Sequence, residues 1–242
     1  MIYVLLPAYN EEKDLGLLLD EFDKLPLAAS CQIVVVDDGS NDATAATAKS
    51  HSDKLRLSVL THRMNRGLGA ALATGFNHIE KLMAPADILV TMDSDNSHKP
   101  ETLALLLKAV DAGADVCVAS RFVPGSKTVG VPLLRRFLSY GASLFLKTLF
   151  PAGEISDYTS GYRAFSGKTV KALSAKYGDL LFTQTGFAAT LEILLKARLF
   201  GSRFAAVPFT LRYDHKRGKS KMKLFKTMGA YMGLAAKAKT GF

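Results

Sequence analysis

Short apolar runs alternate with longer amphipathic stretches over the first half of the chain. Between the runs, apolar residues recur at helical spacing, as at Leu15, Leu18, Leu19 and Phe22. Strands that alternate with amphipathic helices predict parallel β-α-β units, and therefore an α/β fold with a mostly parallel sheet flanked by helices. The predicted strands cover residues 2–6, 32–36, 55–60, 88–92 and 116–119.

A polar cluster follows each of the five predicted strands. In open sheets of parallel strands, ligands bind at the carboxyl ends of the strands. Five clusters at that edge predict one binding site rather than five unrelated loops. The clusters are Tyr9-Asn10-Glu11, Asp37-Asp38-Gly39, residues 63–69, residues 93–98 and Ser120-Arg121.

The fourth strand ends in two carboxylates, Asp93 and Asp95. Side chains two residues apart in an extended chain point the same way, so both can converge on one hard cation. A Mg²⁺ or Mn²⁺ ion held by one or two carboxylates usually carries the phosphates of a substrate. An isolated pair of this kind is most often a polar loop, so the interpretation depends on the other clusters.

Several acidic clusters at one edge would repel a phosphate unless a cation intervened. Carboxylates also accept hydrogen bonds from ribose hydroxyls or base N–H groups. A metal-bridged nucleotide diphosphate meets both conditions. The chain has no Gly-x-x-x-x-Gly-Lys-[Ser/Thr] loop and no Gly-x-Gly-x-x-Gly after the first strand, which argues against P-loop phosphoryl transfer and dinucleotide redox chemistry.

The positive charge of the chain is concentrated at its C-terminal end. The 242 residues carry a net charge of +9, and residues 212–242 hold nine Lys or Arg and one acid, which is eight of those nine charges. Such a segment binds nucleic acid, anionic lipid or a phosphorylated substrate, or is simply solvated. It lacks the aromatic interleaving of a single-strand binder, so we expect no nucleic-acid partner.

The composition places few other limits on function. Cys31 and Cys117 have no metal or redox spacing, which indicates buried free thiols. We expect no signal peptide and no membrane span, because no basic leader and no 18-residue apolar window is present. We expect a main domain over residues 1–211 and a basic loop with an amphipathic, membrane-associating helix over 212–242.

Two stretches are candidates for contact with a membrane surface. Residues 133–150 form an apolar stretch headed by Arg135 and Arg136, and either an interface helix or a core helix fits it. The C-terminal helix also allows two interpretations. Its apolar stripe fits either contact with a membrane surface or packing on the domain. That stripe consists of Leu224, Phe225, Met228, Tyr231, Met232 and Ala235.

The motifs together resemble family 2 glycosyltransferases of the GT-A type, and most of all the dolichol- or polyprenyl-phosphate mannose synthase branch. The resemblance runs from residue 2 to about residue 223 and implies a GT-A, Rossmann-like fold. The motifs that carry it, in order, are Pro7-Ala-Tyr9-Asn10-Glu11-Glu12, Asp37-Asp38-Gly39-Ser40, Arg66-Gly-Leu-Gly69, Met92-Asp93-Ser-Asp95-Asn-Ser-His98, Ser120-Arg121-Phe122, Asp157-Tyr-Thr-Ser-Gly161-Tyr-Arg163, and residues 217–221.

The resemblance also implies roles for individual residues. Asp93 and Asp95 would hold Mg²⁺ or Mn²⁺ on the diphosphate. Some relatives have Gln as a further ligand where this chain has Ser97, so the third ligand is Ser97 or water. The implied catalytic residues are Asp95, Asp157 and Arg121. The donor nucleotide would be bound by Pro7, Tyr9, Glu11, Asp38, Arg66 and Asp93, and the acceptor phosphate by Arg121, Arg135, Arg136, Arg217, Lys219 and Lys221.

The role of Asp157 stays open at this point. It would be a general base for a hydroxyl acceptor, which must lose a proton. A phosphate acceptor is already an anion, and Asp157 would then orient Arg163 or the donor sugar, or form a structural ion pair. Glu192 is flanked by apolar residues, and we expect its carboxylate to meet Arg163 or a loop amide.

The function that follows is inverting transfer of a hexose from a nucleotide-diphosphate sugar to a polyprenyl or dolichyl phosphate. GDP-mannose is the favoured donor, and a UDP-sugar is the other option. We expect the enzyme at the cytoplasmic face of a membrane, with or without a separate membrane-anchoring subunit. The alternatives are a family 2 transferase with a saccharide or other soluble acceptor, and a non-catalytic module that binds nucleotides or anionic surfaces.

Overall fold

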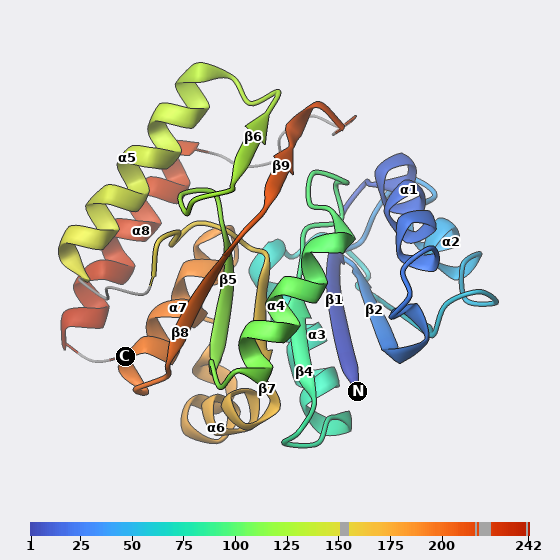
Figure 1. Cartoon of the computed structure of the whole chain (residues 1–242), viewed down its shortest axis with the longest axis horizontal. Coiled ribbons are helices and arrows are strands. Elements are labelled where there is room, and N and C mark those ends of the chain that lie inside the picture. Colours follow the sequence, from blue (N-terminus) through green and yellow to red (C-terminus); the bar gives the residue numbers. More distant parts are fainter. Residues whose placement is uncertain (151–154, 216, 218–223, 241) are drawn as a thin grey trace.

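The computed structural model describes residues 1–150, 155–215, 217, 224–240 and 242. A seven-stranded sheet forms the centre of the molecule, in the order β3-β2-β1-β4-β7-β5-β8 (Figure 1). Its strands are β1 (Ile2–Ala8), β2 (Cys31–Asp37), β3 (Leu57–Thr61), β4 (Ile88–Thr91), β5 (Val116–Ser120), β7 (Arg163–Ser166) and β8 (Phe204–Pro208). A second sheet pairs β6 (Lys127–Val129) with β9 (Thr210–Arg212) in parallel.

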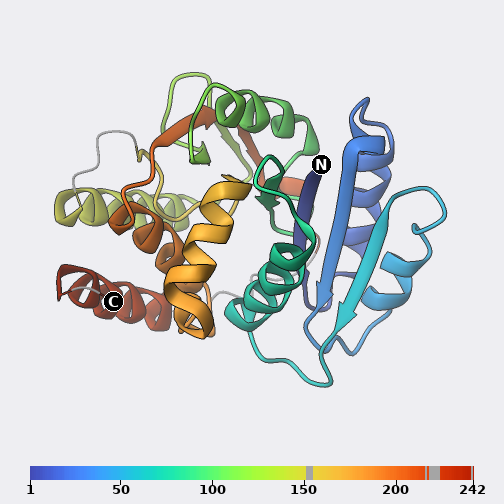
Figure 2. The ribbon, with the colours of Figure 1, turned by 90° about the horizontal axis from the view of Figure 1, so that it is seen from below.

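Helices cover both faces of the sheet (Figure 2). One core contains α1 and α4 and the other contains α3, α6, α7 and α8, so both faces of the strands are buried. This explains why β1, β2, β4 and β5 are mostly continuous apolar runs rather than alternating ones. The helices are α1 (Glu12–Asp23), α2 (Thr44–Lys49), α3 (Leu68–Leu82), α4 (Leu103–Asp111), α5 (Leu133–Leu149), α6 (Gly167–Tyr177), α7 (Ala188–Leu199) and α8 (Leu224–Thr240).

The predicted fold class is confirmed, but the antiparallel strand β7 inside the main sheet is not among the predicted strands. The five predicted strands are β1 to β5, and all run parallel within the sheet. Strand β7 runs antiparallel between β4 and β5, with Leu89 and Val116 both opposite Phe165. Its four residues include only two apolar ones and follow a polar run, so no apolar run of strand length marks it. The domain division at residue 211 stays a prediction.

Helices α5 and α8 lie side by side at the end of the molecule far from α1 and α2 (Figure 1). Each helix is apolar on two sides. Inward, Leu146 of α5 and Leu234 of α8 join the core, while on the outside Leu144 and Met232 are 51% and 61% exposed. Neither helix is therefore only a core helix or only a surface helix. Across the described part of the chain, no helix combines the length and apolar character that crossing a bilayer requires.

Buried polar contacts fix the loop before α3. The Gly69 amide donates to the carbonyl of Thr185, so this loop rests directly on the segment 183–186. The buried Glu192 carboxylate accepts hydrogen bonds from the Thr183 and Gln184 amides at 2.8 and 3.0 Å, and Lys196 lies 2.7 Å from it. The predicted loop-amide contact of Glu192 is confirmed.

We predict that Gly69→Ala destabilises the protein by about 1–3 kcal/mol, the usual effect of overpacking a core. A methyl group at Gly69 would lie 1.7 Å from the Gln184 carbonyl oxygen, so backbone must move. The control is Gly186→Ala on the opposing segment, where nothing lies within 4 Å of the added atom. Urea unfolding of both variants checks the prediction, and equal unfolding midpoints would contradict it.

Candidate active site

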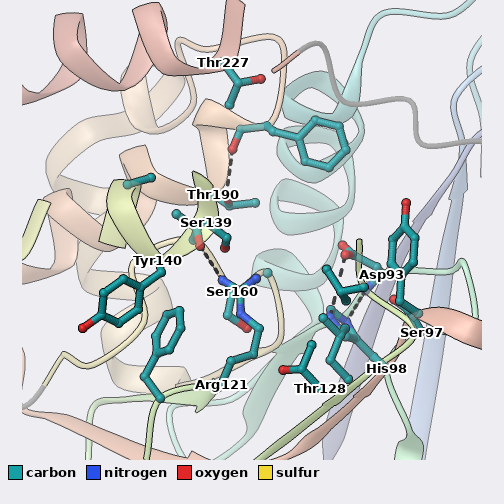
Figure 3. Close-up of a pocket in the computed structure, with 18 of the residues that line it drawn as sticks. Asp93, Ser97, His98, Arg121, Thr128, Ser139, Tyr140, Ser160, Thr190 and Thr227 are labelled. Carbon is teal, nitrogen blue, oxygen red and sulfur yellow. Dashed lines mark hydrogen bonds and ion pairs between the residues drawn. The ribbon is translucent and has the colours of Figure 1, made fainter. Parts of the chain in front are cut away.

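The carboxyl ends of β4 and β5 open into a cavity of about 560 Å³. Figure 3 shows Asp93, Ser97 and His98 on one side of it and Arg121 and Tyr140 on another. The rest of the lining is largely apolar and comes from α5, α8 and the strand β9 with its flanks. These lining residues include Leu133, Phe137, Tyr140, Phe209, Leu211, Tyr213, Thr227, Met228 and Tyr231.

A tight turn after β4 presents the two carboxylates. Asn96 adopts a left-handed backbone with φ of 56°, which asparagine tolerates better than most residues. The amide of Asp93 donates to His98 Nδ1 at 3.3 Å, and the His98 ring stacks on Tyr162. The turn is therefore held rigidly. Within the run 93–98, Asp93 and Asp95 alone are partly exposed, and both line the cavity.

The donor set fits a hard divalent cation bound mainly by substrate and water. The described residues contain no group of three or more His, Cys, Asp and Glu side chains placed to hold a metal. Asp93 and Asp95 would therefore be the protein ligands, as is common for Mg²⁺. The Ser97 hydroxyl donates to Asp95 Oδ1 at 2.5 Å, so in this structure it orients a carboxylate instead of standing free as a third ligand.

The predicted nucleotide residues gather at the ends of β1 and β2. The Asp38 carboxylate is buried and accepts hydrogen bonds from the amides of Arg66 and Gly67 at 2.9 and 2.7 Å. His62 Nδ1 lies 2.6 Å from the same carboxylate. Asp38 thus holds the loop that exposes the Arg66 side chain.

The ends of β1, β2 and β4 are joined to one another. The Glu11 amide donates to Thr44 Oγ1, and the Pro7 carbonyl accepts a hydrogen bond from the Ser94 hydroxyl. Tyr9 is half-buried beside them. Pro7, Tyr9, Glu11, Asp38 and Arg66 lie outside the set of described residues that line the cavity. The predicted nucleotide contacts at the ends of β1 and β2 therefore lie outside the cavity. Asp93 and Asp95 line the cavity itself.

The buried carboxylate of Asp157 forms an ion pair with Arg121, whose side chain is partly exposed. The guanidinium Nε and Nη2 lie 2.7 and 2.8 Å from the two carboxylate oxygens. The amides of Thr159 and Ser160 donate to the same carboxylate at 3.1 Å. Burial raises the pKa of Asp157, but the Arg121 charge and these hydrogen bonds outweigh it and hold the pKa below its ordinary value.

In the structure the contact of Asp157 is an ion pair, and its catalytic role stays a prediction. Its partner is Arg121 and not Arg163. Arg163 is buried and donates instead to the carbonyls of Tyr158 and Thr190. Arg121 projects from the pair into the cavity lining, where an anion could bind.

The structure describes only part of the other predicted phosphate-binding residues. Arg135 and Arg136 lie in the first turn of α5, next to the cavity residue Leu133, and their side chains are outside what the structure describes. The amide of Arg217 donates to Asp14 Oδ2 at 3.0 Å, so this part of the basic loop crosses to α1. Lys219 and Lys221 lie outside the described residues.

The cavity also contains residues to which the sequence had given no site role. Tyr231 had been counted in one apolar stripe of the last helix, but the structure divides that stripe. Tyr231 and Ala235 are buried, whereas Met228 and Met232 are exposed. A 3.6-residue period predicts which positions share a face, but not which neighbour that face meets.

Comparison with known proteins gives a consistent family. The family described as "Glycosyl transferase family 2" matches residues 3–173. Dolichol-phosphate mannosyltransferase of Pyrococcus furiosus is 32% identical over 223 residues, which is 92% of this chain and 59% of that protein. Polyprenol monophosphomannose synthase of Mycolicibacterium smegmatis is 35% identical over 221 residues, covering 90% of this chain and 80% of that one.

Solved structures share the fold at lower sequence identity. Glucosyl-3-phosphoglycerate synthase of Mycobacterium tuberculosis, in complex with Mn²⁺, UDP and glucosyl-3-phosphoglycerate, superposes with a TM-score of 0.70 at 20% identity. The match covers 98% of this chain and 79% of that one. The family match extends over the paired carboxylates, the Arg121–Asp157 pair and most of the sheet, and the chain therefore belongs to glycosyl transferase family 2.

Proposed function

We propose that this protein transfers a hexose from a nucleotide-diphosphate sugar to the phosphate of a polyprenyl or dolichyl lipid at a membrane surface. The observation that carries the proposal is the shape and lining of the cavity. It begins at Asp93, Asp95 and Arg121 and continues between α5 and α8, whose outer faces are apolar. A lipid phosphate needs a polar head site joined to an apolar passage, and this cavity offers both.

The donor side supports a nucleotide diphosphate bound through a divalent cation. Asp93 and Asp95 would hold Mg²⁺ or Mn²⁺, which would neutralise charge on the diphosphate when bound. Pro7, Tyr9, Glu11, Asp38 and Arg66 stay our predicted nucleotide contacts. Asp38 would act chiefly by holding the Arg66 loop, because its carboxylate already accepts two backbone amides. The names of the two relatives favour mannose, and hence GDP-mannose, over a UDP-sugar.

The chemistry requires little proton transfer. An acceptor phosphate oxygen would attack the anomeric carbon while the bond from that carbon to the diphosphate oxygen breaks, and the diphosphate would leave with the electron pair. In-line attack inverts the anomeric centre, so an α-linked donor gives a β-linked product. Because the acceptor is an anion, no general base is needed. Arg121, held in place by Asp157, would position the attacking phosphate by charge.

The acceptor would reach the site from the membrane surface. Helices α5 and α8 expose apolar side chains, and α5 has Arg135 and Arg136 in its first turn. Apolar side chains with flanking cations are typical of helices that lie in a membrane interface. We propose peripheral contact with the cytoplasmic leaflet, and Arg217, Lys219 and Lys221 would add attraction for the lipid phosphate. A separate anchoring subunit stays a prediction.

The transfer reaction itself is the first test. We expect the full chain with Mg²⁺ to give a lipid-linked sugar from labelled GDP-mannose and a polyprenyl phosphate. UDP-glucose and UDP-N-acetylglucosamine, tested in parallel, measure donor specificity. A product from a saccharide acceptor, with none from a lipid phosphate and any donor, would contradict the proposal.

We predict that Asp95→Asn lowers transfer at least about 100-fold, because it removes one of two charged ligands of the proposed cation. Ser97→Ala should weaken Mn²⁺ binding by about 10- to 100-fold, the usual effect of losing a group that orients a ligand. Calorimetric titration with Mn²⁺ and transfer assays at varied Mg²⁺ measure these effects. Full activity of the wild-type protein in excess EDTA would exclude the cation.

We predict that Leu144→Ser and Met232→Ser each weaken binding to phosphatidylglycerol-containing vesicles by about tenfold or more, since each removes an apolar side chain from the interface. Both side chains are largely exposed on α5 and α8. The control is Leu105→Ser, which removes a 44% exposed apolar side chain from α4. Vesicle co-sedimentation compares the three, and equal losses would exclude a specific membrane face.

A further inference from the structure

Tyr231 stands out among the cavity residues because it comes from α8, the helix whose other face we assign to the membrane. The side chain is buried and lines the cavity together with Thr227 and Met228 of the same helix. Met232, the next residue along the chain, is exposed. Helix α8 thus directs an aromatic hydroxyl inward and apolar side chains outward.

The surroundings of Tyr231 carry an excess of positive charge. It interacts electrostatically with Arg121, Arg163 and Asp157. Arg163 is buried, Arg121 is partly exposed to the cavity, and Asp157 is the carboxylate that pairs with Arg121. Asp93 also interacts with both arginines, but in the proposed function its charge is balanced by the divalent cation. The two guanidinium groups and the Asp157 carboxylate together carry one net positive charge, which favours binding of an anion.

The Tyr231 hydroxyl is available to such an anion. Among the described residues it makes no hydrogen bond. A tyrosine in a buried setting normally finds a hydrogen-bond partner for its hydroxyl. The Tyr231 hydroxyl is not among the described polar atoms that are sealed off without a partner, so it lies at the cavity wall, where a ligand can reach it. The neighbouring Thr190 differs, because its hydroxyl donates to the Phe187 carbonyl at 2.7 Å.

We infer that the Tyr231 hydroxyl donates a hydrogen bond to a non-bridging oxygen of the acceptor phosphate, beside Arg121. This inference rests on the proposed function. Burial raises the pKa of Tyr231 to about 12, so the phenol keeps its proton at neutral pH. Tyr231 would therefore act as a hydrogen-bond donor throughout, and no proton moves to or from it during the transfer.

One helix, α8, would contribute both to the membrane contact and to binding of the acceptor phosphate. When α8 is seated with Met232 toward the lipid, Tyr231 faces the cavity. Deleting α8 would remove both contributions together and could not distinguish them. Substitutions on the two faces separate them, because Met232→Ser alters the outer face and Tyr231→Phe alters only the inner hydroxyl.

The test uses Tyr231→Phe in the full chain, which keeps the ring and removes the hydroxyl. Two probes are titrated calorimetrically in detergent-free buffer with Mg²⁺: a ten-carbon prenyl phosphate and the prenyl alcohol of the same length. We expect phosphate binding to weaken about 10- to 100-fold, the range for a hydrogen bond to a charged group, and alcohol binding to stay unchanged. The KM for the lipid phosphate should rise while the KM for the nucleotide sugar does not.

Tyr177→Phe is the matched control, because Tyr177 lies on α6 beside Lys176 and Lys196 and is not part of the cavity lining. It should match the wild type for both probes, and vesicle binding of Tyr231→Phe should be normal. If the wild type transfers sugar to a lipid phosphate and Tyr231→Phe does so with unchanged KM and kcat, the inference is wrong and the proposed function stands. If the wild type neither transfers sugar nor binds the prenyl phosphate, both are wrong.

Discussion

The ion pair between Arg121 and Asp157 is the contact on which the centre of the molecule depends. The Asp157 carboxylate is fully buried, and its burial is tolerated because the pairing with Arg121 is bidentate and the backbone amides of Thr159 and Ser160 satisfy the carboxylate. Removing one partner of a buried pair typically costs about 3–5 kcal/mol. The pair fixes the segment after β5 against the segment before β7. It also holds the Arg121 guanidinium in a fixed orientation.

The charges of the site are divided between two places. Carboxylates gather at the ends of β1, β2 and β4, where a cation and a nucleotide diphosphate would bind. Arg121 lines the cavity and Arg163 is buried near it, where the anionic acceptor would bind. Asp93 belongs to both places, since it lines the cavity and interacts with both arginines. In the proposed function this arrangement would hold two anionic substrates at adjoining sites without direct repulsion between them.

Contacts of Gly69 and Glu192, away from the proposed reacting groups, fix the start of α3 and the loop before it relative to the cavity. The loop before α3 touches backbone at Gln184 and Thr185, and only glycine fits there at position 69. Glu192 holds that backbone from below, while Phe187 and Thr190 of the following residues line the cavity. The segment 183–190 therefore supports the loop that carries Arg66 and forms part of the cavity wall.

The order of strands and helices, the five polar strand ends, the paired carboxylates and the C-terminal charge could all be predicted from the sequence, because each depends on local spacing and composition. Strand β7 could not, since four residues with two apolar side chains form a strand only between two existing neighbours. The partner of Asp157 was equally hidden, because Arg121 is 36 residues away and the pairing is made by the sheet. The direction in which Tyr231 points depends on how α8 packs against α5 and α7. Local periodicity determines the faces of a helix, and only tertiary packing decides what each face meets.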